Sequence, residues 1–480
     1  MLNEKKKVGI VLDNPSRDLN GVLLVAYELV QNQIDCYIIP MNFVNAETWV
    51  LDLDFIITNY IRKNNHSFIK KLINSKLPFG VLDTEGGIIE IKSYLDTIGD
   101  KILSSSASLY FCWGKTQAKH LINEAYYHKD SLVITGSPRY DFYNQTYLPL
   151  FYSTLPAFFK NNPYILVNTT FTLCNPKFKT ISREKDIYIK DLGWSHELYN
   201  TRYQSQKLAM DGIISLVQKL SKIHSDLNFV LRPHPFENIG SYKDKLNNIE
   251  NIHVIHEGSV DKWIAKSKAI IAYNCSTSYE AGLLNVPAFY PTYLGSPPKV
   301  KQILDASILC ASENVLFKNI NDVLENKYVY PESLKDNIQN IKENWFSGND
   351  GLAHKRISVA ILESIQNTTK VKLNKILRRI NLYELDLSIK KMNFQFIKKI
   401  IRLILNIPYG KSIFGNTFLE NKSFDKWNKS DKAFNKDEVN QIIKLIHRKK
   451  KKNMPHVEEV RNKYTDIYYP KKLLSIKLTK

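Results

Sequence analysis

The residues best suited to chemistry are the Arg and the His of the tetrapeptide Arg-Pro-His-Pro at positions 232–235. This tetrapeptide ends the apolar run 228–231, which is typical of a buried strand, and parallel α/β sheets collect their ligands at the carboxyl ends of such strands. The two prolines favour extended backbone at Arg232 and His234, so both side chains are restricted in direction. A cation and an imidazole held there suit a phosphate group. Because a lone His-Pro after a strand is more often an ordinary turn, this interpretation depends on companion motifs.

The sequence Asp-Thr-Glu-Gly-Gly at 83–87 supplies carboxylates after another apolar run, 79–82. A carboxylate at the end of a strand is well placed as a general base for an acceptor hydroxyl, and Gly86 and Gly87 would let a ligand approach the backbone. We prefer Glu85 as the base because it adjoins the glycines, with Asp83 as the alternative. An Asp- and Gly-rich turn with Glu85 in solvent explains the same residues equally well.

A cluster of hydroxyl side chains, Asn-Cys-Ser-Thr-Ser-Tyr-Glu-Ala-Gly at 274–282, follows the apolar run 269–272. Ser276, Thr277 and Ser278, together with free backbone N–H groups at a helix start, predict a phosphate site. The competing interpretation is a capping box formed by Thr277 and Glu280, which would satisfy the same helix without a ligand. The cluster gains weight because it and Arg-Pro-His-Pro should lie at neighbouring strand ends of one sheet.

Thr-Gly-Ser-Pro-Arg-Tyr-Asp at 135–141 ends the last strand predicted for the first half of the chain. Its Gly and Pro fit a hinge, and we expect a structural role for it. Arg139 either faces the cleft or pairs with Asp141.

The elements that must position these motifs form two successive sets of strands that alternate with helical patterns. Strands are predicted at 8–12, 36–39, 55–58, 79–82, 109–112 and 132–135, and then, after a Pro- and aromatic-rich connection at 147–163, at 164–169, 228–231, 252–255, 269–272 and 288–290. Helices are predicted at 19–31 and 205–225. This alternation is typical of doubly wound parallel sheets, so we predict an α/β protein with Rossmann-like domains at 1–150 and 151–368 that face a cleft. The first strand leads into Asp-Asn-Pro-Ser-Arg rather than Gly-x-Gly-x-x-Gly, which argues against a dinucleotide cofactor.

The net charge of +20 is concentrated at the C-terminal end of the chain. Residues 370–480 contain 28 Lys and Arg against 10 Asp and Glu, a net +18, which leaves +2 for residues 1–369. The segment 392–405 combines a wide apolar stripe with paired cations, and His447–Lys452 is a polybasic run. We predict that 369–480 is a basic amphipathic helical extension that binds an anionic membrane surface through 370–452. The alternative is that its apolar stripe packs onto the core as an ordinary helical extension.

The remaining composition narrows the class of protein. No apolar run approaches the roughly 18 residues of a membrane span, and the charged start 1–7 leads into a strand rather than a signal-peptide core, so we expect a cytoplasmic protein that is peripheral on the membrane. The five cysteines are scattered without a Cys-x-x-Cys pair, which supports neither a disulfide frame nor a zinc site.

In order and spacing, these motifs resemble those of GT-B glycosyltransferases that use cytidine-nucleotide sugars, such as bacterial sialyltransferases and capsule Kdo transferases. The motifs at 136–141, 232–235 and 276–278 are also similar to those of CDP-glycerol glycerophosphotransferases. Bacterial surface carbohydrate (capsule and O-antigen) biosynthesis proteins resemble the chain best, through the motifs at 135–141, 232–235 and 274–281. The resemblance covers roughly residues 5–367 and does not reach the basic extension.

The resemblance implies roles for individual residues. His234 would contact the donor phosphate with Arg232 nearby, the hydroxyls of 276–278 would hold the same phosphate, and Glu280 would meet a ribose hydroxyl. Glu85 or Asp83 would deprotonate the acceptor in an inverting displacement, although Asp-Thr-Glu-Gly replaces the family's two adjacent acids before Gly and leaves the identity of the base open. No Asp-x-Asp signature stands at a matching strand end, so we expect metal-independent chemistry without a cofactor.

We therefore expect a transferase of surface polysaccharide or lipid-linked glycan biosynthesis, with a nucleotide-sugar donor and a glycan or lipid-linked acceptor. A CMP-linked acidic sugar, such as Kdo or a nonulosonic acid, is the first choice of donor. The alternative enzyme is a CDP-glycerol-type polyol-phosphate transferase. The alternative from another class is a nucleic-acid-binding protein that acts through its basic end. We do not favour it because that region has no RNP, zinc or helix-turn-helix signature and its cations accompany an apolar stripe.

Overall fold

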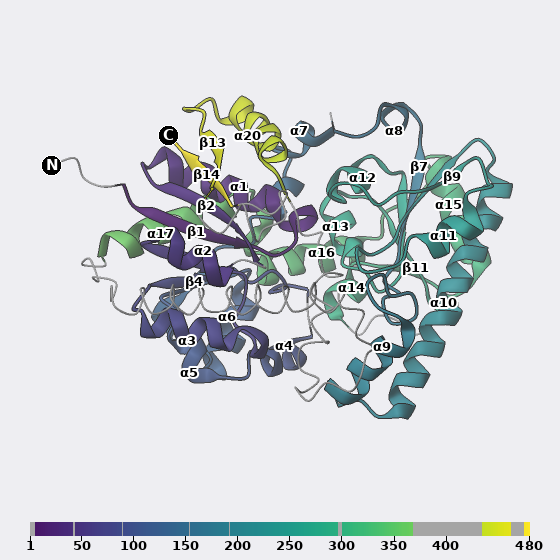
Figure 1. Ribbon diagram of the computed structural model, residues 1–480. Coiled ribbons are helices and arrows are strands. Elements are labelled where there is room, and N and C mark those ends of the chain that lie inside the picture. The colour runs from purple at the N-terminus through teal and green to yellow at the C-terminus, as the bar shows by residue number, and fades with distance from the viewer. Residues whose placement is uncertain are drawn as a thin grey trace, which may run out of the picture.

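The computed structural model describes residues 5–41, 44–88, 90–152, 154–191, 193–295, 300–367, 434–461 and 475–480. They form two α/β domains that lie side by side, each built around a twisted sheet with helices on its faces (Figure 1). The predicted segment 392–405 falls outside the described residues.

The first domain contains an eight-stranded sheet in the order β13-β14-β2-β1-β3-β4-β5-β6, of which β2 to β6 are parallel. Its strands consist largely of buried apolar residues, as expected for a sheet covered on both faces. The parallel strands are β1 (Lys7–Leu12), β2 (Asp35–Pro40), β3 (Phe55–Thr58), β4 (Phe79–Val81), β5 (Leu109–Cys112) and β6 (Leu132–Ile134). The helices are α1 (Pro15–Gln31), α2 (Val44–Val50), α3 (His66–Asn74), α4 (Ile91–Ile98), α5 (Lys101–Ser105) and α6 (Lys115–Asn123).

The second domain contains a parallel six-stranded sheet in the order β12-β11-β10-β7-β8-β9, the doubly wound order of Rossmann folds. The connection between the domains includes α7 (Leu148–Tyr152) and α8 (Ala157–Asn161). The strands are β7 (Tyr164–Asn168), β8 (Asn228–Arg232), β9 (Ile252–Val254), β10 (Ala269–Ala272), β11 (Ala288–Pro291) and β12 (Ile308–Cys310). The helices are α9 (Ile181–Asp186), α10 (His196–Ile223), α11 (Gly240–Leu246), α12 (Asp261–Lys266), α13 (Thr277–Leu283), α14 (Lys301–Asp305), α15 (Glu313–Leu324) and α16 (Glu332–Trp345). The predicted GT-B arrangement of two doubly wound domains facing a cleft is confirmed.

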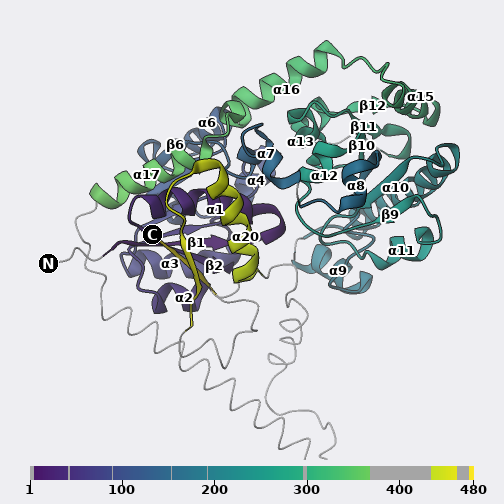
Figure 2. The same cartoon turned by 90° about the horizontal axis from the view of Figure 1, so that it is seen from above.

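After α16 the chain returns to the first domain, where α17 (Ala353–Asn367) packs along α1 (Figure 2). Ile357 and Ile361 are fully buried in the same core as β1 and α1. The two carboxylate oxygens of Asp141 accept hydrogen bonds from the backbone N–H groups of Ala353 and His354 at the start of α17. The helix at 353–367 therefore completes the first domain, although the sequence placed it in the second.

The end of the chain also belongs to the first domain. Helix α20 (Lys436–Lys450) buries Val439, Ile442, Ile443 and Ile446 in the core shared with α1 (Figure 2). Strand β14 (Ile476–Thr479) pairs antiparallel with β2, and β13 (His456–Glu459) pairs antiparallel with β14 at the edge of the sheet. These apolar residues recur at helical spacing, so only packing against another element removes their stripe from water.

The described part of the predicted basic extension is thus a structural part of the first domain, which corrects its assignment as a separate unit. Within the polybasic run, Lys450 Nζ pairs with Glu28, its side chain is 8% exposed, and Lys452 pairs with Glu28 at 3.2 Å. No helix among the described residues combines the length and apolar character needed to cross a bilayer.

Candidate active site

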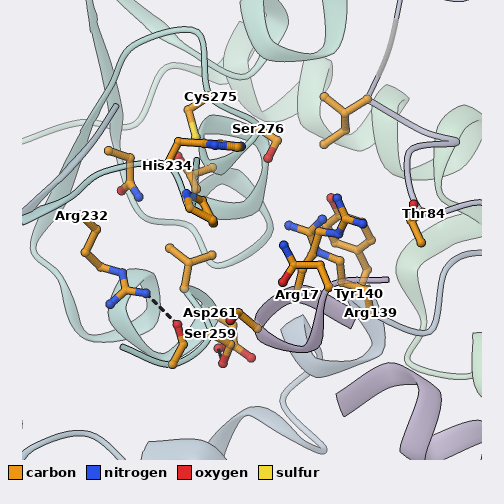
Figure 3. A pocket seen from close by; sticks show the side chains of 18 of the residues that line it. Arg17, Thr84, Arg139, Tyr140, Arg232, His234, Ser259, Asp261, Cys275 and Ser276 are labelled. Carbon is orange, nitrogen blue, oxygen red and sulfur yellow. Dashed lines mark hydrogen bonds between the residues drawn. The ribbon is translucent and has the colours of Figure 1, made fainter. Parts of the chain in front are cut away.

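The candidate site is a cleft of about 390 Å³ between the two domains, lined by residues that end or follow β1, β4, β5 and β6 on one wall and β7 to β10 on the other. In the second sheet, β7 lies between β8 and β10. From β7 the sheet is built outward to one side by β8 and β9 and to the other side by β10, β11 and β12. The boundary between β7 and β10 is therefore the switch point where doubly wound sheets bind ligands. The first sheet has a corresponding junction between β1 and β3. Both sheets therefore present their switch points to one cleft. Figure 3 shows His234, Cys275 and Ser276 on the second domain, opposite Arg17 and Arg139 of the first.

His234 lines the cleft with a fixed hydrogen-bonding pattern. Its Nδ1 accepts the backbone N–H of Phe236 at 3.2 Å, so in the neutral ring the proton resides on Nε2, which is left to donate. Burial lowers the pKa of His234 to about 4, and the charges of Arg17 and His256 act in the same direction. The imidazole is therefore neutral near pH 7 and offers an N–H donor rather than a charge.

The loop that carries His234 is anchored by Glu237, which the sequence analysis missed. This carboxylate is 1% exposed and accepts hydrogen bonds from the backbone N–H of His234 at 3.0 Å and from the Thr169 hydroxyl at 2.9 Å. The Tyr242 hydroxyl donates to its other oxygen. In the sequence, Glu237 could have been singled out by its position three residues after His234 in a Pro-rich loop. Glu237 therefore fixes the imidazole relative to the end of β7.

Arg232 lines the same cleft, but its guanidinium group donates hydrogen bonds to backbone carbonyl oxygens. Its two Nη atoms donate to the carbonyl oxygens of Glu257 and Gly258 at 2.9 and 2.7 Å, and its guanidinium lies over the Trp263 ring. Burial lowers its pKa to about 10, against the opposing charges of Glu257 and Asp261, so it stays protonated at neutral pH. Arg232 thus holds the loop after β9 in place and leaves a positive charge behind the cleft wall.

The hydroxyl cluster after β10 divides between the cleft and the core. Ser276 and Thr277 line the cleft, whereas Ser278 is 1% exposed and is not among the residues that line it. Thr277 begins α13, but the cap residue Ser276 makes no side-chain cap bond, so the predicted Thr277–Glu280 capping box does not form. The Ser276 hydroxyl instead donates to Glu280 at 3.3 Å.

Glu280 joins the two domains. It is fully buried, and its oxygens accept hydrogen bonds from Arg139 at 2.5 Å and from the Tyr143 hydroxyl, both residues of the first domain. Burial alone would lower the pKa of Arg139, but the charge of Glu280 and the neighbouring acidic groups have the larger effect, so the pKa of Arg139 is raised. Arg139 therefore lines the cleft and pairs with Glu280, whereas Asp141, the other partner considered, caps α17. The implied contact of Glu280 with a ribose hydroxyl stays a prediction.

The two candidate bases occupy different environments. Glu85 lines the cleft with its side chain 50% exposed, accepts a hydrogen bond from Arg62 at 2.8 Å and lies 3.9 Å from Arg17. Asp83 is 3% exposed and does not line this cleft; its oxygens accept from the Glu85 backbone N–H and the Tyr94 hydroxyl, both at 2.9 Å. Burial raises the pKa of Asp83, and the nearby charge of Arg62 opposes this shift. Of the two carboxylates, only Glu85 reaches the cleft.

Gly86 and Gly87 have a packing role rather than the ligand-contacting role expected from the sequence. A Cβ at Gly87 would collide with the Trp113 ring, a Cβ at Gly86 would collide with the Gln117 side chain, and neither glycine lines the cleft. Trp113 in turn donates its indole N–H to the carbonyl oxygen of Asp83 at 2.8 Å. The glycines therefore allow the turn after β4 to lie flat on this ring, which sets the position of Glu85.

Several polar residues of the cleft were missed, namely Asn14, Arg17, Asn168 and Asp261. Arg17 forms a bidentate pair with Asp18 at 2.8 and 2.9 Å and adds a cation to the first-domain wall. Asn14 follows the central strand β1, and Asn168 is the last residue of the central strand β7. Their positions at the ends of predicted strands could have marked both as candidate site residues. Among the residues that the structure describes, no group of three or more His, Cys, Asp or Glu is arranged to hold a metal ion.

Neither the sequence models of known protein families nor the curated proteins match this chain. Among solved structures, it is similar to the UDP-GlcNAc 2-epimerase of Neisseria meningitidis bound to UDP-GlcNAc, with 14% identity over 74% of this chain and 100% of that one and a TM-score of 0.48. The epimerase of Methanocaldococcus jannaschii in complex with UDP-GlcNAc and UDP gives 14% identity, 74% and 99% coverage and a TM-score of 0.48. The wall teichoic acid polymerase TagF gives 11% identity, 75% and 89% coverage and a TM-score of 0.49.

Proposed function

We propose that this protein is a glycosyltransferase that transfers a sugar from a nucleotide donor to a hydroxyl of a surface glycan or lipid-linked acceptor. The observation that carries the proposal is the pairing, across one cleft, of a neutral imidazole with a donating Nε2–H on the second domain and a carboxylate, Glu85, on the first. An N–H donor aimed at a leaving phosphate and a base aimed at an attacking hydroxyl are the two groups that such a displacement requires.

On this proposal the second domain binds the donor. The phosphate lies against His234 Nε2–H and the hydroxyls of Ser276 and Thr277, and the charges of Arg17 and Arg139 attract it from the opposite wall. As the bond between the anomeric carbon and the phosphate oxygen breaks, charge grows on that oxygen and the hydrogen bond from His234 strengthens. A neutral donor suits this step because it stabilises the developing charge without binding the free anion too tightly.

Glu85 completes the reaction from the first domain. It removes the proton of the acceptor hydroxyl while the acceptor oxygen forms a bond to the anomeric carbon, and the nucleotide departs with the electrons of the broken bond. Attack from the wall opposite the leaving group inverts the anomeric configuration. We propose that side chains alone carry this chemistry, so activity should persist in excess EDTA.

We propose a CMP-linked acidic sugar as the donor, because the family resemblance of the three motifs points to cytidine nucleotides and the cleft is rich in cations. A CDP-activated polyol is the alternative donor. Thermal melting of the protein with CMP, CDP, UDP and GDP tests the nucleotide, because a ligand that binds only the native state raises the melting temperature. Incubation with CMP-sugar or CDP-glycerol and an acceptor then separates the two reactions by product. If none of these nucleotides raises the melting temperature, the proposal is refuted.

Contact with an anionic membrane surface remains part of the proposal only for residues 370–433, which lie outside the described residues. The support is their positive charge, since cations near an anionic leaflet each contribute on the order of 1 kcal/mol. The full-length protein should bind anionic but not neutral liposomes, and the binding should fall sharply with added salt. Binding that ignores lipid charge would contradict this part of the proposal.

A further inference from the structure

Two residues that line the cleft each have a side-chain carbonyl oxygen without a hydrogen-bond partner among the described residues. Oδ1 of Asn168, at the end of β7, and Oδ1 of Asn14, after β1, are both buried and find no donor among the residues that the structure describes. Asn168 is 6% exposed as a whole, and both residues line the cleft. The two oxygens belong to opposite walls, one at the switch point of each sheet.

Local structure does not account for either oxygen. Asn14 is the cap residue of α1, where an Asn side chain usually accepts a backbone N–H, yet here only its backbone carbonyl accepts bonds, from the N–H groups of Arg17 and Asp18. The backbone carbonyl of Asn168 accepts the N–H of Tyr273 at 3.2 Å, but among the described residues no donor reaches its side-chain Oδ1. A buried acceptor without a donor is costly, and in binding sites the missing donor commonly belongs to the ligand.

The chemistry of these atoms identifies what they bind. A carbonyl oxygen only accepts hydrogen bonds, and so do the oxygens of an ionised phosphate, so a phosphate cannot satisfy Oδ1 of Asn14 or Oδ1 of Asn168. The cations, the imidazole and the hydroxyls of the cleft serve the phosphate, whereas these two oxygens require O–H or N–H donors. The ligand must therefore carry donors next to its phosphate.

We infer that Asn168 and Asn14 form a specificity subsite that binds hydroxyl or amine donors of the ligand, one from each wall of the cleft. This inference rests on the proposed function and refines it, because it requires a hydroxyl-bearing phosphoester rather than any phosphate. Two parts of a sugar nucleotide carry such donors: the nucleoside, through its ribose hydroxyls and base amine, and the transferred group. Because the two oxygens lie on opposite walls, the subsite forms fully only when the ligand bridges the domains.

The test uses Asn168→Leu, which keeps the approximate shape and removes the oxygen, and Asn168→Ala, which cannot overpack. Asn14→Ala tests the opposite wall, and Tyr199→Phe is a matched control, because the Tyr199 hydroxyl is also buried without a partner but does not line the cleft. For each variant the melting temperature without ligand is measured first. Titrations with CMP, CMP-N-acetylneuraminate and CDP-glycerol follow.

Asn168→Leu should melt at or above the temperature of the unchanged protein, because an unsatisfied acceptor is replaced by an apolar group of similar shape. The same variant should bind the ligand that the unchanged protein prefers about tenfold more weakly, which is the loss of one hydrogen bond. Tyr199→Phe should leave binding unchanged. Weakened binding of CMP itself places the donor on the nucleoside, whereas weakening only of the sugar- or glycerol-linked nucleotide places it on the transferred group.

Two results would overturn the inference alone: unchanged ligand affinity in the Asn168 and Asn14 variants, or a fall of several degrees in melting temperature for both Asn168→Leu and Asn168→Ala. The second result would mean that the protein itself satisfies the amide. If the unchanged protein binds none of the three ligands, the proposed cytidine-nucleotide donor fails, and the inference that rests on it fails as well.

Discussion

Helix α20 offers a direct test of the architecture, because its apolar face is buried in the core of the first domain. Ile443 is fully buried in the cluster that contains α1 and α17. Replacing it with Ala removes three carbon atoms, which corresponds to about 2.4 kcal/mol of transfer free energy at about 0.8 kcal/mol each. The cavity left behind adds to this loss, so we expect a total of about 3 kcal/mol. For a domain of this size, that lowers the melting temperature by about 6 to 12 °C.

Differential scanning calorimetry of Ile443→Ala and of Lys444→Ala provides the comparison. Lys444 is the exposed neighbour on the same helix, so its replacement introduces the same residue without removing any packing and should change stability by no more than about 0.5 kcal/mol. Equal melting temperatures for the two variants would refute the packing of α20 on the first domain. If the packing is correct, a protein shortened to end at Asn367 should aggregate or lose its melting transition.

Three further predictions concern the cleft. His234→Ala should lower turnover by roughly two orders of magnitude without unfolding the protein, and near-normal turnover would remove the residue from the mechanism. Glu85→Gln should abolish turnover and leave nucleotide affinity almost unchanged, whereas Asp83→Asn should retain more activity; the reverse order in steady-state assays would exchange their roles. The pKa of His234 falls from 6.5 to about 4 on folding. Between these pH values the imidazole of the unfolded chain binds a proton while that of the native protein stays neutral. The free energy of unfolding therefore falls as the pH falls through this range, by up to about 3 kcal/mol. His234→Gln should flatten this part of the melting temperature against pH, and an unchanged slope would contradict the assigned environment.

The local pattern of the sequence was sufficient to predict most strands of both sheets, since runs such as 55–58 and 269–272 match β3 and β10 residue for residue. It also placed His234, Glu85 and Thr277 at strand ends, which the parallel topology then brings to one cleft. Strands β12, β13 and β14 were missed, the last two because residues 369–480 were predicted to be a helical extension.

What the sequence could not show is which partner covers an apolar stripe. Helix α17 and helix α20 both have clear amphipathic patterns, but a pattern does not reveal whether the covering surface is the adjacent domain, the distant one or a lipid. The same limit explains Gly86 and Gly87, because a glycine that admits a ligand and one that admits the Trp113 ring look alike along the chain. The buried carboxylate of Asp83 likewise accepts a hydrogen bond from the Tyr94 hydroxyl, and Tyr94 lies on α4 rather than in the loop after β4.

The pairing of β14 with β2 has a consequence for how the protein is made. About 440 residues separate the two strands, and at the usual pace of synthesis of about 5–20 residues per second the ribosome needs roughly 20 to 90 s to produce the second after the first. During that interval β2 is an exposed sheet edge and α1 has an uncovered apolar surface, the kind of edge that pairs with other chains. The first domain starts to form early and is completed last, so a nascent chain is most prone to aggregation while its second domain is being synthesised.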